Sequence, residues 1–233
     1  MTSTDLPAET PVDRRHAQKQ RTRAQIVEAA GELVREHPGE RLNVEQLIER
    51  ADVSRRTIFN HFETLDEILI AVGFERLRVF RDALSDRLAH EPRPLDRTQL
   101  LALFGDVLQH ESLPDTIAHF VSMLGVAPQH SSRSHQIFHG VFNQLSEVLI
   151  ADMLHDNPAL DRFDADLVIT NVIGGMEVVT RAWLPPDASQ PTACVNGDTV
   201  PLTPESRERF RALLARLIAS WQGSAPTEPS THA

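Results

Sequence analysis

Cysteine and long apolar runs are scarce in this sequence. The single cysteine, Cys194, excludes an intrachain disulfide and a structural zinc site built from several thiolates, and it fits a reducing compartment. No run of about 18 uncharged apolar residues occurs, and the first twenty residues lack an apolar core followed by a small-residue cleavage site. We therefore expect a cytoplasmic protein that is neither exported nor membrane-spanning.

Familiar catalytic motifs are also missing. The sequence contains no GxSxG, no glycine-rich phosphate loop after a strand, no HExxH and no cysteine in a catalytic setting. We therefore expect neither catalysis nor a cofactor. An all-α enzyme and a helical interaction protein that does not bind DNA remain as alternatives.

The charges are distributed unevenly along the chain. The sequence has 23 basic and 33 acidic residues, a net charge of −10, which argues against a surface that binds nucleic acid everywhere. Through Phe62, however, ten basic residues balance ten acidic ones, so the acidic surplus lies in the remainder. A nucleic-acid function is therefore expected in the first quarter.

A basic segment opens this first quarter. Residues 14–23, RRHAQKQRTR, hold five cations and no acid, which is also typical of a solvated tail. Thr22 to Gln25 has the form of a capping box, and apolar residues at helical spacing follow as far as Pro38. We expect a flexible basic arm over residues 1–20 and a helix that begins at Thr22. Cations oppose the helix dipole there, so their placement favours a docked polyanion.

Two short helices follow. Asn43 is a plausible N-cap for a helix ending at Ala51, and Ser54 for one spanning residues 55–62. Asp52 tolerates the left-handed backbone that a tight break requires. Two short helices about three residues apart indicate a helix-turn-helix. The second helix carries no acid, so its polar face suits a major groove.

The chain resembles the TetR family of bacterial transcriptional regulators. The resemblance covers roughly residues 20–72 and rests on RAQIVEAAGELVREHPG, on NVEQLIERADVSRRTIFNHF and on TLDEILIAV. It implies an all-α fold, with an N-terminal three-helix DNA-binding domain (21–64) and a larger helical regulatory, ligand-binding and dimerisation domain (65–222). It also implies a homodimer on double-stranded palindromic operator DNA, most readily a repressor released by a small, mainly apolar effector.

The resemblance assigns DNA contacts residue by residue, and three positions depart from the family pattern. Phe59 replaces a frequent tyrosine, Leu65 replaces a common lysine, and Asp52 replaces the usual turn glycine. The first two remove expected phosphate contacts. With the basic arm included, the predicted DNA-binding residues are Arg21, Arg23, Asn43, Ser54, Arg55, Arg56, Thr57, Phe59, Asn60 and His61.

Helical patterns continue through the body. Thr64 caps a helix from residue 65 toward Leu88, and further helices are predicted at 96–110, 113–126, 132–155, 164–184 and 204–221. The Asn-Gly within residues 192–200 favours a small hairpin. Residues 223–233 have the composition of a disordered tail.

The last two predicted helices carry wide apolar stripes that something must cover. We expect two copies of each helix to form a four-helix dimer interface, with a monomer core as the alternative. The predicted dimerisation residues are Val168, Val172, Val179, Phe210, Leu214, Leu217 and Trp221. Gly174-Gly175 costs roughly 2 kcal/mol relative to two alanines, so close approach of another backbone or space for a ligand is expected there.

Large apolar residues spread over the body helices predict a ligand cavity, with a filled core as the alternative. The predicted ligand-binding residues are Phe104, Leu108, His119, Phe120, Met123, Phe138, Phe142, Asn143, Asn171, Met176, Glu177 and Trp183. His135 and His139, at i and i+4, have metal-ligand spacing but lie on the flank of the apolar face. No metal site is therefore expected.

Overall fold

A computed structural model describes residues 11–37, 40–110, 112–124, 132–184 and 203–222. Within them the chain forms nine helices and no strand, which confirms the all-α prediction. The helices are α1 (Pro11–Glu36), α2 (Val44–Ala51), α3 (Arg55–His61), α4 (Leu65–His90), α5 (Arg97–Leu108), α6 (Leu113–Leu124), α7 (Ser132–Asp156), α8 (Arg162–Trp183) and α9 (Pro204–Trp221).

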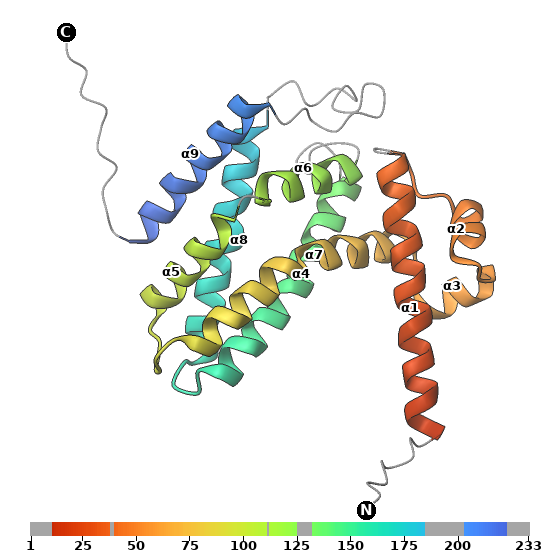
Figure 1. Cartoon of the computed structure of the whole chain (residues 1–233), viewed down its shortest axis with the longest axis horizontal. Helices are drawn as coiled ribbons and strands as arrows, with labels where there is room; N and C mark the ends of the chain where they lie inside the picture. Colours follow the sequence, from red (N-terminus) through yellow and green to blue (C-terminus); the bar gives the residue numbers. More distant parts are fainter. Residues whose placement is uncertain (1–10, 38–39, 111, 125–131, 185–202, 223–233) are drawn as a thin grey trace, which may run out of the picture.

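Helices α1 to α3 form a small head at one end, and α4 runs from it into a body formed with α5 to α9 (Figure 1). The head closes around fully buried Ile26, Leu47 and Ile58. On its surface Arg50 of α2 donates to both carboxylate oxygens of Glu36 at 2.9 and 2.7 Å, which ties α2 to α1. The orientation of the short α2 and α3 is thus set by a common core and an ion pair.

Local capping signals place the helix starts as predicted. The Asn43 side chain accepts from the backbone of Glu45, Ser54 Oγ accepts from Thr57 N at 3.0 Å, and Thr64 caps α4. Asp52 adopts the left-handed backbone at φ 48°, which confirms the tight break between α2 and α3.

The predicted start of the first helix is wrong. Helix α1 begins at Pro11, and Thr22 lies inside it, where its hydroxyl donates to the carbonyl of Gln18 at 3.1 Å. Residues 11–20 are therefore helical, so the prediction of a flexible arm is wrong for them; residues 1–10 lie outside the described part. A residue that can cap a helix start can also sit inside a longer helix when the preceding residues continue it.

The body is a bundle in which α4 lies against α7, and α8 against α9 (Figure 1). Observed helix ends differ from the predicted ones by a few residues at most, within the part described. The predicted hairpin at 192–200 and the tail at 223–233 lie outside the described residues. None of the described helices is long and apolar enough to cross a membrane.

Candidate nucleic-acid interface and apolar cavity

The outer face of α3 presents cations and amides to solvent. Arg55, Arg56 and Asn60 are exposed, Phe59 is 40% exposed, and Ile58 points into the head core. None of the seven residues of α3 is acidic. This face can therefore donate hydrogen bonds to an anionic or acceptor-rich partner.

Two predicted contact residues have their side-chain oxygens engaged in capping. Asn43 Oδ1 accepts from Glu45 N at 2.8 Å, and Ser54 Oγ lies 2.8 Å from Thr57 Oγ1 in addition to its cap bond. These bonds hold the starts of α2 and α3 in place. Asn43 and Ser54 therefore contribute mainly by fixing the helix starts.

Arg23 lies against the end of α3. Its Cζ atom is 4.1 Å from the centre of the Phe62 ring, and Nη1 donates to the carbonyl of His61 at 3.4 Å. Nδ1 of His61 is buried and has no hydrogen-bond partner among the described residues. Burial above all lowers the pKa of His61, and the positive charges of Lys19 and Arg23 lower it further. Together these groups form a compact basic corner where α1 meets α3.

Residues 26–72, which span α2, α3 and parts of α1 and α4, match the family model described as bacterial regulatory proteins, tetR family. The segment of this chain around α2 and α3 therefore matches the TetR family. The matched residues include both helices of the predicted helix-turn-helix, α2 and α3. The match also confirms the resemblance on which the α3 contacts were predicted.

Two of the solved structures that match align with most of the chain. A transcriptional regulator from Rhodococcus sp. Rha1 is 19% identical, with a TM-score of 0.40, and the alignment covers 89% of this chain and 99% of that one. A gamma-butyrolactone receptor (ArpA like protein) is 20% identical, with a TM-score of 0.30 and coverage of 89% and 100%. No curated protein matches the chain.

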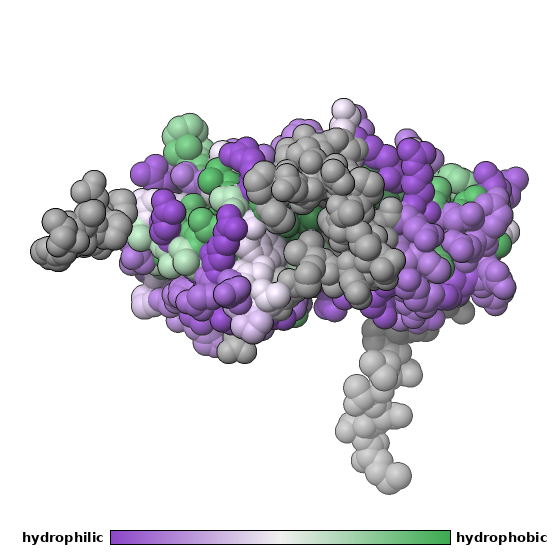
Figure 2. All heavy atoms as spheres, turned by 90° about the horizontal axis from the view of Figure 1, so that it is seen from above, coloured by the Kyte–Doolittle hydropathy of each residue, from purple (hydrophilic) through white to green (hydrophobic). Residues whose placement is uncertain are grey.

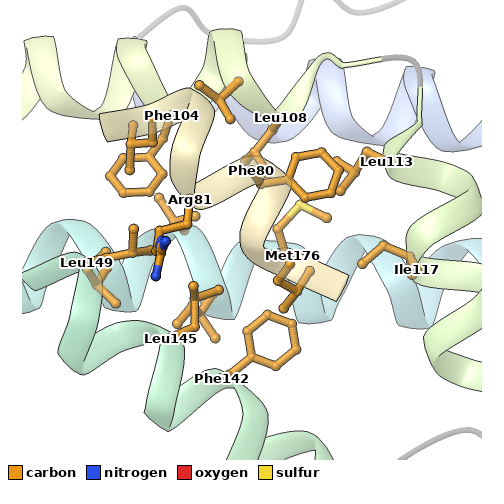
Figure 3. Close-up of a pocket in the computed structure, with 16 residues that line it drawn as sticks. Phe80, Arg81, Phe104, Leu108, Leu113, Ile117, Phe142, Leu145, Leu149 and Met176 are labelled. Carbon is orange, nitrogen blue, oxygen red and sulfur yellow. The ribbon is translucent and has the colours of Figure 1, made fainter. Parts of the chain in front are cut away.

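The body of the chain contains an apolar cavity of about 70 Å³ between α4, α5, α6, α7 and α8 (Figure 3). Among the described residues that line it only Arg81 is charged, and its Nε and Nη2 donate to Asp82 Oδ1 at 3.1 and 2.7 Å. In Figure 3 Arg81 lies beside Leu149 at one end of the cavity, and Ile117 lies at the other. The walls therefore suit an apolar guest.

The cavity includes four of the twelve residues predicted to bind a ligand: Phe104, Leu108, Phe142 and Met176. The other eight predicted residues do not line this cavity, and their predicted place in its wall is wrong: His119, Phe120, Met123, Phe138, Asn143, Asn171, Glu177 and Trp183. Asn143 and Asn171 are exposed, and Trp183 is held by Phe210 and Ser206. Apolar content along the chain did not reveal which core residues border the space. The missed lining residues include Phe80, Leu145 and Ile169.

His119 is half-buried on α6 near the head. Its Nε2 atom is buried and has no hydrogen-bond partner among the described residues. Burial lowers the pKa of His119 most, and the charges of Arg76 on α4 and Arg35 on α1 add to the effect. The imidazole of His119 therefore lies on α6 near the positive charges of one arginine of α1 and one of α4.

Most predicted dimerisation residues are core residues of the single chain. Val168, Val172, Val179, Phe210 and Leu214 are each at most 6% exposed, so the prediction that they contact a second copy is corrected. Leu217 and Trp221 are only partly exposed and pack against the core. An apolar stripe shows that a helix face is covered, but it does not say by what.

The exposed face of α8 is a different stripe. Phe163 and Val178 are 69% and 54% exposed, and Leu167, Thr170 and Gly174 lie between them at helical spacing. We call these five residues the α8 outer stripe. It carries no charge, whereas most of the surface visible in Figure 2 is hydrophilic, with apolar residues emerging mainly at the body end. Its spacing of i, i+4, i+7, i+11 and i+15 was readable in the sequence.

The histidine pair on α7 is exposed, as its flank position predicted. The rings of His135 and His139 lie 4.2 Å apart. Within the described part of the chain no third histidine, cysteine or acid joins them in a metal-binding group.

Proposed function

We propose that this regulator is a repressor that binds a palindromic operator as a homodimer and releases it when a small apolar effector enters the body. The observation that carries the proposal is the acid-free face of α3, with Arg55, Arg56 and Asn60 exposed on a rigidly capped helix. A capped helix with free donors on one side suits the major groove, which presents acceptors on every base pair.

The proposed contacts divide into base and phosphate contacts. Arg55, Thr57 and Asn60 face base edges, while Arg56 and His61 meet phosphates. Thr57 is half-buried and already shares a hydrogen bond with Ser54, so its part is smaller than that of the two exposed residues. Phe59 supplies apolar contact.

The basic corner and the start of α1 add affinity without sequence preference. Arg21 is exposed on α1, and Arg23 is held against Phe62 at the end of α3. Cations that contact only phosphate strengthen binding to all sequences alike and make it salt-dependent.

Two heads reach successive major grooves only if the chain dimerises. The α8 outer stripe is the surface we assign to the dimer, because it is uncharged, exposed and continuous over most of α8. Half-sites are then expected about 34–36 Å apart, one turn of the duplex.

The apolar cavity is the proposed effector site. Helix α4 supplies Leu77, Phe80 and Leu84 to its wall and also carries the head, so a guest that moves α4 changes the placement of α3. Effector and operator then weaken each other by the same factor.

Selection of bound sequences from a random DNA pool, followed by mobility-shift assays at several salt concentrations, tests the proposal. We expect a palindrome, and binding that weakens as salt rises. Asn60→Ala is expected to weaken binding to the selected site by roughly 1–3 kcal/mol and to relax one position. Arg21→Gln, as the matched variant, weakens all sequences equally. A protein that enriches no sequence contradicts the proposal.

A further inference from the structure

Arg55, at the first position of α3, is held by two neighbours before any DNA is bound. Its Nη1 donates to Glu45 Oε1 at 3.2 Å, and its Cζ lies 5.5 Å from the centre of the Phe59 ring. Glu45 belongs to α2, and Phe59 lies one turn further along α3. One arginine thus joins both helices of the helix-turn-helix on its exposed side.

The carboxylate that holds Arg55 is itself fixed. Glu45 is in the first turn of α2, where the helix dipole favours a negative charge, and its backbone N–H donates to Asn43 Oδ1 at 2.8 Å. Helix α2 is anchored in turn by buried Leu47 and by the ion pair of Arg50 with Glu36. The position of Glu45 is therefore fixed by contacts within the head, and it can hold Arg55 before DNA binds.

The ring of Phe59 orients the guanidinium in a second direction. A guanidinium near an aromatic face is attracted by the electron density of the ring. Phe59 is 40% exposed although it is a large apolar side chain, and Arg55 covers part of it. With the carboxylate at one nitrogen and the ring centre 5.5 Å from Cζ, the guanidinium is restrained from two directions.

The donors that remain determine what Arg55 can bind. A guanidinium has five N–H donors in one plane, and among the described residues only Nη1 has a hydrogen-bond partner. The edge formed by Nε and Nη2 is left for two parallel bonds, which is how arginine binds O6 and N7 of guanine in the major groove. Glu45 compensates part of the positive charge of Arg55, whereas Arg56 has no ion pair among the described residues, so Arg55 attracts phosphates less strongly than Arg56 does.

We propose that Glu45 and Phe59 are positioning residues that aim Arg55 at a guanine in each operator half-site, and that Glu45 also suppresses binding of Arg55 to phosphate on unrelated DNA. The inference rests on the proposed entry of α3 into the major groove. The inference names the base that Arg55 contacts, guanine. It also gives a role to Glu45, an acidic residue on the face that is proposed to meet DNA.

The test uses the full-length protein, the operator obtained by selection, and duplexes in which single guanines of the half-site are replaced by 7-deazaguanine. That base keeps Watson–Crick pairing but lacks the N7 acceptor. We expect one guanine at which the replacement weakens wild-type binding about 10- to 100-fold, the range for the loss of one hydrogen bond to a charged group. Arg55→Lys, which keeps the charge, should lose this discrimination.

Glu45→Gln separates positioning from charge when it is compared with Glu49→Gln. Glu49 lies in the same helix, is exposed, and has no ion pair among the described residues, so both variants remove one negative charge from α2. Both should bind unrelated DNA more tightly at low salt, Glu45→Gln more so because it frees Arg55. Only Glu45→Gln should lose discrimination at the chosen guanine, by at least 5-fold, and Phe59→Leu should lose part of it.

Three results overturn the inference while the proposed function stands. They are a selected site at which no 7-deazaguanine weakens binding, unchanged discrimination in Glu45→Gln, and an equal loss in Glu49→Gln. Circular dichroism of each variant shows whether the helices are intact. If Glu45→Gln loses them, Glu45→Ala takes its place in the same comparison. Failure to select any sequence overturns the proposed function itself.

Discussion

Leu217 of α9 packs directly onto Gly175 of α8. A Cβ atom at Gly175 would lie 2.9 Å from Cδ2 and 3.1 Å from Cγ of Leu217, with Cδ1 closer still. Gly174, its neighbour, has nothing within 4 Å of the same position. One interpretation of the sequence was that the glycine pair leaves space for a ligand, and this interpretation is wrong. Gly175 allows close packing of α9, and Gly174 lies on the exposed α8 outer stripe.

Substitutions at the two glycines should differ in sign. Gly174→Ala is expected to raise the free energy of unfolding by up to about 1 kcal/mol, because alanine is the better helix former and its methyl meets open space. Gly175→Val is expected to lower it by roughly 1–3 kcal/mol through overpacking against Leu217. Urea unfolding of both variants measures the difference. Equal stability of the two variants would show that α9 does not pack as described.

The proposed role of the α8 outer stripe in dimerisation can be tested with a valine on the stripe and a control valine on another helix. Val178 on the stripe and Val79 on α4 are 54% and 57% exposed, so an aspartate is solvated equally well at either position in the monomer. Val178→Asp is expected to shift a dimer to monomers and to weaken operator binding at least 10-fold, because a charge is buried without a partner at an interface. Val79→Asp should stay dimeric.

Analytical ultracentrifugation of the two valine variants gives the result directly. A dimeric Val178→Asp protein would place the dimer contact on another surface. Leu217→Asp is a poor substitute, since Leu217 already packs against Gly175 and its loss disturbs the protomer.

A hydroxyl in the cavity wall should weaken an apolar guest. Val172 lines the cavity, whereas Val168, one turn earlier on α8, is buried outside it. Threonine at either position should cost roughly 1–3 kcal/mol of stability by burying a hydroxyl. Only Val172→Thr should also reduce the affinity for xenon, an apolar probe small enough for a cavity of about 70 Å³, as measured by xenon NMR. If both variants bind the probe equally, the probe occupies another site.

His119 and His61, each with one buried ring nitrogen, should make folding sensitive to mild acid. The pKa of His119 is lowered from 6.5 in the folded chain, so the unfolded chain takes up its proton first as the pH falls. Stability is therefore full above about pH 6.5 and declines below it, and His61 contributes with the same sign. Thermal melts between pH 8 and pH 5 should show a shallower decline for His119→Gln than for His135→Gln, an exposed control on α7. Identical slopes in the two variants would assign the acid sensitivity to other groups.

Sequence patterns predicted helix starts and the turn between α2 and α3 well, because the interacting residues lie within one helical turn of each other. Asn43, Ser54 and Thr64 cap helices through backbone N–H groups two or three residues away, and the left-handed turn at Asp52 also depends on local backbone chemistry. The same kind of signal at Thr22 was misleading, because the residues before it continue the helix to Pro11.

The sequence by itself determined the all-α character, the helix ends within a few residues except at the start of α1, and the resemblance of the α2–α3 segment to the TetR family. These features could be predicted because periodicity and capping are properties of neighbouring residues. Only the tertiary structure decided that Phe210 and Leu214 are covered from within the chain, that Leu217 fills the space beside Gly175, and that Glu45 holds Arg55. These contacts join residues of different helices, and their distances depend on how rigid helices pack. A pattern along one helix marks a face that must be buried, but the partner that buries it is chosen in three dimensions.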